Sequence, residues 1–267
     1  MKNSHLGRAS DYPDTLTPQL LDPVPRVEGR RALGLDSALP FRGADLWTAW
    51  ELSWLNLDGR PIVAALSFCV AADSPALIES KSLKLYLNSF SMSRFAAQSD
   101  VEVQLAGDLS HCAGSAVSVR LSLTGNSAAI SELPGACIDS EGVSCRVYER
   151  DASLLRSGGE IVSETLHSHV LRSLCPVTAQ PDTGSVMIRY RGPRIDRGAL
   201  LAYIVSFRQH SDFHELCVER MFMDLKAQCG AEDLTVYARY NRRGGIDINP
   251  FRSNVETDPP ELRLWRQ

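Results

Sequence analysis

The chain has 267 residues, of which 44% are hydrophobic and 22% are charged, and its formal net charge is −4. These values are typical of a globular protein with one large domain or two of ordinary size. The negative charge argues against a nucleic-acid backbone as the main ligand. The sequence has no apolar run of about eighteen residues that could span a membrane. The N-terminus has no apolar segment typical of a secretory signal, so we expect a cytoplasmic protein.

The seven cysteines are odd in number, and no two of them have the Cys-x-x-Cys spacing. Reduced thiols are therefore expected rather than a disulfide scaffold. The nearest approaches to a zinc-ligand pattern are His111-Cys112 and the pair Cys137 and Cys145, and neither has the spacing of a known zinc motif. The sequence predicts no metal site.

The first half of the chain begins with a stretch of forty residues that contains five prolines and few apolar runs. This composition favours an extended arm over a core element. After it, an Asn-Leu-Asp-Gly turn separates two apolar runs, which is typical of a hairpin. Hydrophobic spacing then predicts strands over 46–57 and 62–71, helices over 80–95 and 101–112, and a strand over 117–121.

The second half repeats this order, with strands predicted over 166–175 and 186–190, helices over 200–207 and 213–229, and a strand over 234–240. The two halves align without a gap at an offset of 117 residues, with nine identities over 44 positions. Tyr86 aligns with Tyr203, and Glu102 aligns with Glu219. The repeat predicts a duplicated ββααββ module.

The repeat fails at two polar motifs. Glu79-Ser80-Lys81-Ser82 aligns with Asp-Arg-Gly-Ala at 196–199, and His214-Glu215 aligns with Ala97-Gln98. Each half thus retains polar residues that the other lacks. We expect one site to which both modules contribute, since ligand pockets concentrate at domain interfaces.

Cys175 and Asp182 lie seven residues apart around a Gln-Pro-Asp-Thr-Gly turn. A thiol and a carboxylate in one loop could act as a nucleophile and a proton donor. A buried structural cysteine and a turn aspartate are the alternatives. His214 and Glu215 add a titratable ring and a carboxylate that suit a polar heterocycle. Asp212 is predicted to cap the helix that begins there, with Glu215 completing a capping box.

Two further motifs could bind phosphate. Residues 79–82 open a helix, where a serine cap with surface charges is one interpretation, and phosphate binding by the helix amides and Lys81 is the other. Residues 239–245 combine three arginines with two glycines, which suits a phosphate as well as a solvated hairpin tip. The sequence has no Gly-x-Gly-x-x-Gly motif, so a nicotinamide cofactor would bind outside any Rossmann crevice.

Taken together, these motifs resemble the NADPH-dependent 7-cyano-7-deazaguanine reductases, the nitrile reductases of queuosine biosynthesis. The Glu-Ser-Lys-Ser motif distinguishes that family from the GTP cyclohydrolases I, which share its fold. The matching segments run nearly end to end: Trp50–Asn56, Ile78–Phe90, Cys175 to Asp182, Phe213–Glu215 and Tyr237–Gly245.

The resemblance implies an α+β fold of tandem tunnelling-fold (T-fold) ββααββ modules, with antiparallel sheets and helices packed on one face. It divides the chain into an extended arm (1–40), a first module with the Glu-Ser-Lys-Ser motif (41–150) and a second module with the remaining site residues (151–267). It also implies a homodimer that consumes two NADPH per turnover, needs no metal, and acts on a free base rather than on nucleic acid or at a membrane.

The resemblance further implies a role for individual residues. Cys175 matches the nucleophile that forms a covalent thioimidate with the nitrile, Asp182 matches the proton donor, and His214 matches a residue that contacts substrate and assists proton transfer. The implied substrate contacts are Ile78, Glu79, Ser80, Phe213, His214 and Glu215, and the implied NADPH contacts are Ser80, Lys81, Arg243 and Gly244.

Two other functions remain open on the residues alone. The first is a hydrolase like the GTP cyclohydrolases, which would need a zinc site of Cys and His ligands. The second is a purine- or pterin-binding module without catalysis, in which Cys175 would be inert.

Overall fold

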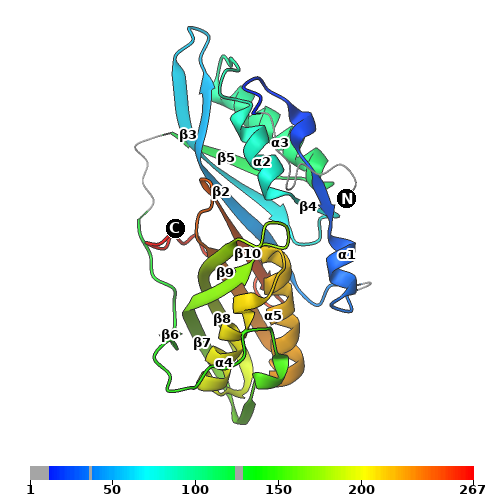
Figure 1. Ribbon diagram of the computed structural model, residues 1–267, viewed down its shortest axis with the longest axis vertical. Helices are drawn as coiled ribbons and strands as arrows, with labels where there is room; N and C mark the ends of the chain where they lie inside the picture. Colours follow the sequence, from blue (N-terminus) through cyan, green and yellow to red (C-terminus); the bar gives the residue numbers. More distant parts are fainter. Residues whose placement is uncertain (1–11, 36–37, 124–128) are drawn as a thin grey trace. The chain divides into compact units, whose positions relative to one another are not determined.

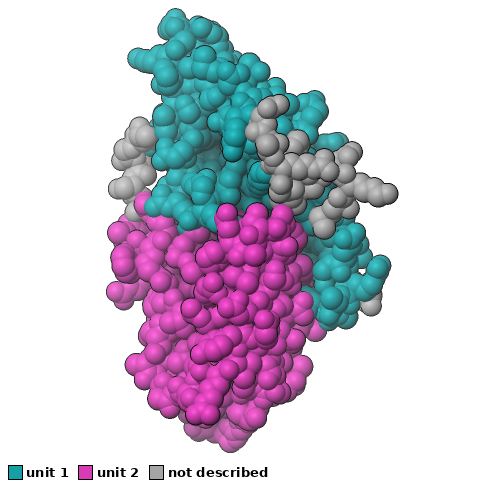
Figure 2. Space-filling model, viewed as in Figure 1, with its two compact units in different colours: residues 1–36, 45–128, 242–247 teal, residues 37–44, 129–241, 248–267 magenta. Residues whose placement is uncertain are grey.

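The computed structural model describes residues 12–35, 38–123 and 129–267, and the chain divides into two compact units (Figures 1 and 2). Both units combine antiparallel strands with a few helices, which confirms the predicted α+β class. No helix within the described ranges is long and apolar enough to cross a membrane. Unit 1 comprises residues 1–36, 45–128 and 242–247, and unit 2 comprises residues 37–44, 129–241 and 248–267.

Unit 1 is built on strands β2, β3 and β5, with α2 and α3 on one side of them (Figure 1). Every second residue of β3 from Ala64 to Val70 is buried, so one face of the strand supplies core. Leu66 of β3 pairs with Leu121 of β5 in an antiparallel register. The elements of this unit are η1 (Pro18–Leu20), β1 (Pro23–Pro25), α1 (Arg26–Arg31), β2 (Arg42–Leu55), β3 (Pro61–Ala71), β4 (Ala76–Ile78), α2 (Ser80–Asn88), α3 (Gln98–Ala113) and β5 (Ser118–Leu123).

The expected arm is only partly extended over its described residues, because residues 26–31 form helix α1. Arg26 of this helix is buried, and its Nη2 lies 2.5 Å from the Asp45 carboxylate. Its Nε donates to the Ser74 hydroxyl at 3.0 Å. A paired and hydrogen-bonded guanidinium anchors this segment within unit 1. Residues 1–11 and 36–37 of the expected arm lie outside the described part of the chain.

Unit 2 is built on a long hairpin of β7 and β8, followed by β9 and β10, with α4 and α5 on the same face of the sheet (Figure 1). The hairpin register runs from Ser157 opposite Ile195 to Leu174 opposite Pro181. The elements are β6 (Ala136–Cys137), η2 (Ala152–Leu154), β7 (Ser157–Leu174), β8 (Pro181–Ile195), α4 (Arg197–Ser206), η3 (Phe207–Gln209), α5 (His214–Cys229), β9 (Asp233–Tyr240) and β10 (Ile246–Ser253), the last from residue 248 onward.

The same buried hydrogen bond occurs in both units. In unit 1 the Tyr86 hydroxyl donates to Asp108 at 2.7 Å, and in unit 2 the Tyr203 hydroxyl donates to Asp224 at 2.5 Å. Both tyrosines are fully buried, and each is on the first helix of its unit's pair, with the aspartate on the second. The tyrosines align at the 117-residue offset and the aspartates lie 116 residues apart, so the two helix pairs form an equivalent bond with a shift of one residue on the second helix.

The core of unit 2 contains an ion pair that is completely buried. Arg252 of β10 donates from Nε and Nη2 to one oxygen of Glu219 on α5, at 3.0 and 2.9 Å. Both side chains have zero exposed area. Loss of either partner would leave an uncompensated charge in the core, which makes this pair a strong constraint on how α5 packs.

Several elements differ from their predicted limits, most of all α2, β7 and β8, the last of which runs five residues farther at each end than the predicted strand over 186–190. Helix α2 ends at Asn88, well before residue 95, because residues 93–95 bond to the end of β2: Leu55 donates to the Ser93 carbonyl and Phe95 donates to the Leu55 carbonyl, both at 2.9 Å. Strand β7 begins at Ser157, nine residues earlier than predicted, because its polar and glycine-rich start hides the strand pattern in the sequence.

Candidate active site

Cys175 lies in the tight loop that joins β7 to β8. Its N–H donates to the Gln180 carbonyl at 2.9 Å, and its own carbonyl accepts from the Ala179 N–H at 3.0 Å. Ala179 adopts a φ of +55°, a left-handed conformation that is uncommon outside glycine. The loop therefore closes on itself and holds a partly exposed thiol at the end of the hairpin.

Asp182 stands at the same end of the hairpin, directly opposite Ser173 in the β7–β8 register. Residues directly opposite in an antiparallel pair point to the same face, so the Asp182 carboxylate and the Ser173 hydroxyl share one face. Two residues farther along β8, Gly184 pairs with Tyr240 of β9. A Cβ on Gly184 would lie 2.6 Å from the Arg239 carbonyl oxygen, so only glycine allows this approach.

The chain before α5 brings His214 to this place. Leu174, the last residue of β7, donates to the His210 carbonyl at 2.8 Å and accepts from the Asp212 N–H at 3.1 Å. His214 Nε2 consequently lies 3.1 Å from the Asp182 carboxylate. The imidazole also stacks on the Tyr240 ring, with centroids 3.9 Å apart and planes within 10°. These hydrogen bonds thus bring the loop that carries Cys175, the Asp182 carboxylate and the His214 ring to one end of the hairpin in unit 2.

One buried polar atom at this position, the Nδ1 of the His214 ring, has no hydrogen-bond partner among the described residues. Nε2 of the same ring faces Asp182, and the Ser173 and Tyr240 hydroxyls lie within hydrogen-bond reach of each other and of the Cys217 thiol. Burial raises the pKa of Tyr240 well above its usual value, so its hydroxyl stays protonated and can donate. Since buried polar groups normally have partners, the unpaired Nδ1 of His214 indicates a place for a polar ligand or water.

The predicted Asp212 cap of α5 is wrong. The N-cap residue is Phe213, and no side chain caps the helix. Asp212 instead accepts from the Phe213 N–H at 3.0 Å and pairs with Arg220 at 3.2 Å. The bond between Asp212 and Leu174 holds the chain extended one residue longer than the capping pattern predicts. Glu215 is buried in the first turn of α5.

In unit 1, the Glu79 side chain caps helix α2. Its carboxylate accepts from the N–H groups of Lys81 and Ser82 at 2.9 and 2.7 Å, and the residue is buried. The predicted serine cap is therefore wrong, and these two amides are already satisfied by protein rather than left for a phosphate. Ile78 is buried at the end of β4, and Ser80 is the first residue of α2.

The turn that carries Arg243 and Gly244 also belongs to unit 1. Gly244 and Gly245 have φ values of +63° and +78°, a conformation that favours glycine at both positions. A Cβ on Gly244 would lie 3.0 Å from Cε of Lys84 on α2. Lys84, Gly244 and Gly245 line a pocket of about 270 Å³. Lys84 follows Lys81 by three residues, so both lie on one side of α2. Lys84 was not among the predicted site residues, although its spacing from Lys81 could have indicated a role.

Comparisons with known proteins agree on one family. A family model described as "Nitrile reductase, 7-cyano-7-deazaguanine-reductase N-term" matches residues 12–121, and one described as "QueF-like protein" matches residues 181–259. A protein of Chromohalobacter salexigens named NADPH-dependent 7-cyano-7-deazaguanine reductase is 53% identical over 270 residues, which cover 100% of this chain and 98% of its own. A protein of the same name from Azoarcus sp. (strain BH72) is 53% identical over 254 residues, covering 94% and 90%.

The chain belongs to the NADPH-dependent 7-cyano-7-deazaguanine reductase family. This confirms the resemblance inferred from the motifs. The two family models span Glu79, Asp182 and His214, while Cys175 falls between the matched ranges and within the full-length match to the Chromohalobacter reductase.

The residues near the 270 Å³ pocket fit the cofactor of this reductase family in part. Lys84 lines the pocket together with Glu51, and Lys81 one helical turn earlier and Arg243 next to Gly244 would add to the positive charge that a dinucleotide's phosphates require. Arg242 of the same turn stacks over the Trp50 ring at 4.7 Å, which helps to fix the turn. The pocket is smaller than the roughly 300–1,000 Å³ of typical ligand sites, so it would accommodate part of NADPH.

Proposed function

We propose that this chain reduces the nitrile group of 7-cyano-7-deazaguanine to the primary amine of 7-aminomethyl-7-deazaguanine, as a cytoplasmic enzyme of queuosine biosynthesis. Family membership supports the reaction. The observation that carries the mechanism is the contact of 3.1 Å between His214 and Asp182, at the end of the hairpin that presents Cys175.

The first step is addition of the Cys175 thiol across the carbon–nitrogen triple bond. The sulfur forms a bond to the nitrile carbon, one π bond breaks, and the nitrogen takes up a proton, which gives a covalent thioimidate. Only the thiolate attacks, so a base must take the thiol proton as the bond forms. Asp182 delivers a proton to the nitrogen, and His214 is close enough to exchange one with it.

The thioimidate is a better hydride acceptor than the nitrile from which it forms. When bound, NADPH supplies hydride, and two molecules are consumed because conversion of a nitrile to an amine takes four electrons. After the first reduction the Cys175 thiolate leaves and an imine remains. The protein must hold this imine away from water until the second reduction, since water would hydrolyse it.

Carboxylates recognise the deazaguanine ring in this proposal. Glu215 is buried beside His214 at the start of α5, and Phe213 stacks on the base. Glu79 and its neighbours Ile78 and Ser80 supply further contacts. An ionised carboxylate has about four lone-pair positions. Glu79 uses two of them on backbone amides, so acceptor capacity remains for a donor edge of the substrate.

Ser80, Lys81, Arg243 and Gly244 bind NADPH in this proposal, and Lys84 joins them. The reduction needs no metal. The architecture is two T-fold modules behind an arm, with boundaries near residues 40 and 150, and the enzyme is a homodimer. The recurrence of element order and of a tyrosine–aspartate hydrogen bond between the two helices of each pair supports the duplicated module.

The ratio of NADPH oxidised to amine formed tests this function. The purified chain is mixed with 7-cyano-7-deazaguanine and excess NADPH, oxidation is followed by absorbance, and the amine is quantified by chromatography with mass detection. Two NADPH per amine is the expected ratio. An aldehyde product, a carboxylate product or amine formation without NADPH would contradict the proposal.

A further inference from the structure

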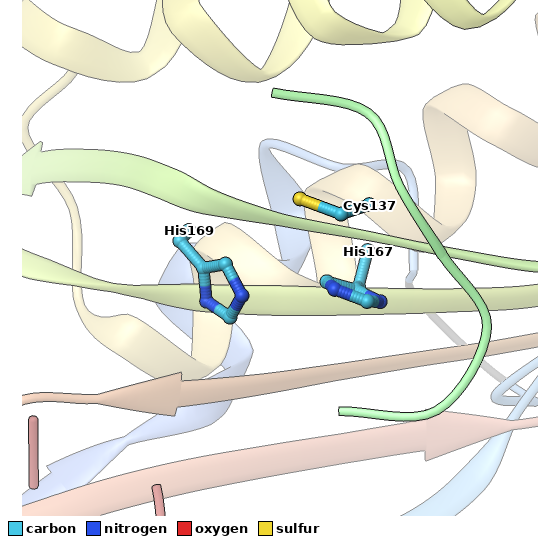
Figure 3. A group of neighbouring side chains, drawn as sticks. All are labelled: Cys137, His167 and His169. Atoms are coloured by element: carbon cyan, nitrogen blue, oxygen red, sulfur yellow. The ribbon is translucent and has the colours of Figure 1, made fainter. Parts of the chain in front are cut away.

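Three potential metal ligands meet in unit 2 on strands β6 and β7. They are Cys137, His167 and His169, and one donor atom from each lies within 4.8 Å of the other two. Figure 3 shows the two imidazoles on one strand and the cysteine beside them. His167 and His169 share a face because they alternate along β7. Cys137 pairs directly with His167 in the parallel β6–β7 register.

The backbone around Cys137 is fixed by bonds that do not involve these side chains. The Ile138 N–H donates to the His167 carbonyl at 3.0 Å. Gly135 has a φ of +90°, and a Cβ there would lie 2.1 Å from the Thr165 carbonyl oxygen. Only glycine permits this approach, so the chain is held against β7 where it presents the cysteine. The backbone that carries the three ligands is thus held in place by contacts other than those of the ligands themselves.

Each histidine already has a partner for one ring nitrogen. His167 Nδ1 lies 3.1 Å from the Pro134 carbonyl oxygen, which can only accept, so Nδ1 carries the proton and Nε2 has a free lone pair. His169 Nδ1 lies 2.8 Å from the Ser185 hydroxyl, which can accept from an Nδ1–H, and that tautomer leaves Nε2 to bind metal. Metal-binding histidines almost always donate their second ring N–H to such a group, because this fixes the tautomer and the ring orientation.

The surroundings suit a divalent cation. His167 is buried and His169 is half-buried, so both rings are partly shielded from bulk water. The Asp139 carboxylate accepts from the backbone N–H of His169 at 3.0 Å. Glu132 lines the adjacent pocket of about 410 Å³. These two carboxylates offset the nearby Arg266 guanidinium. The pocket gives water access to a fourth coordination position.

We propose that Cys137, His167 and His169 form a zinc site that fastens the segment around β6 to β7. Three protein ligands of Cys and His type with one open position are a familiar zinc arrangement. Bond lengths of about 2.0–2.1 Å to nitrogen and 2.3 Å to sulfur place tetrahedral donors roughly 3.4–3.6 Å apart. The donor atoms are now up to 4.8 Å apart, so side-chain rotations that move them by about an ångström would bring them to these distances.

The sequence predicts no metal site, because these ligands are not close together in the chain. Cys137 and His167 are thirty residues apart, and only the β6–β7 pairing brings them together. The proposed site is independent of nitrile reduction, since none of its ligands belongs to the residues assigned to catalysis or NADPH binding.

Cobalt substitution tests the proposal, because Co²⁺ bound by a thiolate in tetrahedral geometry has a sulfur-to-metal charge-transfer band and strong visible bands. The metal-free full chain is titrated with Co²⁺, and then with Zn²⁺ in competition. One equivalent of Co²⁺ should produce both kinds of band, and Zn²⁺ should remove them. Cys137→Ser should abolish the charge-transfer band, and His169→Gln should weaken binding by at least about tenfold.

Matched controls separate this site from other ligands in the chain. Cys145→Ser removes a cysteine of the same segment, and His111→Gln removes an exposed histidine on α3; both should bind Co²⁺ like the wild type. Absence of a thiolate band in the wild type would overturn the proposal. Bands that persist in Cys137→Ser but vanish in Cys175→Ala would also overturn it, since the metal would then sit on the thiol assigned to catalysis.

A stability measurement tests the fastening role. A ligand that binds only the folded state raises the melting temperature. Zn²⁺ should raise it for the wild type and for Cys145→Ser, and leave it unchanged for Cys137→Ser. Circular dichroism of the metal-free variants verifies that each one folds. Equal shifts in Cys137→Ser and Cys145→Ser would show that zinc binds elsewhere.

Discussion

Glu79 has two roles in this account, and replacing it by alanine should affect stability and substrate binding separately. Its buried carboxylate accepts from two backbone amides at the start of α2. Loss of an N-cap side chain costs about 0.5–2 kcal/mol, and two charge-assisted bonds at a buried position favour the upper end. We therefore expect Glu79→Ala to lower the free energy of unfolding by about 2 kcal/mol.

Asp196 provides a matched control, because it caps α4 at the position 117 residues later. It accepts from one amide, that of Ala199, at 2.8 Å, and it is exposed. Asp196→Ala should cost about 1 kcal/mol by the same reasoning. Urea denaturation of both variants measures the capping effect without reference to catalysis.

Substrate binding should distinguish the two variants. In a Cys175→Ala background, which prevents the covalent step, calorimetric titration gives the dissociation constant of the cyano base. Loss of a charge-assisted hydrogen bond worth about 1.5–3 kcal/mol predicts binding roughly 10–100-fold weaker for Glu79→Ala. Asp196→Ala should bind like its parent. If the two changes alter stability but leave both dissociation constants equal, Glu79 is a helix cap alone and its assignment to the substrate is refuted.

Three other substitutions probe the remaining parts of the account. Asp182→Asn should lower kcat by about 10²–10⁴-fold, because it removes a proton donor beside His214, while the nitrile dissociation constant stays near that of the wild type. Stopped-flow kinetics measures the first quantity and calorimetry the second, and a loss confined to binding would contradict the assignment. Lys81→Ala should raise the KM for NADPH by about tenfold or more and leave that for the nitrile unchanged, whereas an effect on the nitrile alone would rule out the cofactor role. Glu219→Ala should lower the free energy of unfolding by about 3–5 kcal/mol, since it leaves Arg252 buried and unpaired; a urea midpoint equal to that of the wild type would show that water reaches this pair.

Much of the fold could be predicted because hydrophobic spacing carries it. The strands before and after the Asn-Leu-Asp-Gly turn and the core of helices α2 to α5 follow their apolar periodicity, whereas helix α1 lies in a segment that was expected to be extended. Helix ends were less predictable. The limits of α2 and α5 depend on hydrogen bonds to β2 and β7, which are distant in sequence, and such bonds leave no local pattern.

The identity of the site residues could be predicted from the sequence, but their arrangement in space could be predicted only in part. Motif resemblance selected Cys175, Asp182 and His214, but nothing in their spacing shows that Leu174 bonds to the chain before α5 and brings His214 to the Asp182 carboxylate. The burial of Arg26 could not be predicted from the sequence either. A charged residue in a proline-rich arm suggests a solvated position, whereas pairing with Asp45 makes burial possible.

The central claim is that the Cys175 sulfur bonds to the nitrile carbon. Intact-protein mass spectrometry after incubation with 7-cyano-7-deazaguanine, without NADPH, tests it most directly. The account predicts a mass increase equal to one whole nitrile molecule in the wild type and in Cys145→Ser, with fragmentation locating it on Cys175, and no increase in Cys175→Ala. An unmodified wild-type protein that still forms amine when NADPH is added, or an equal adduct on Cys175→Ala, would contradict the covalent mechanism.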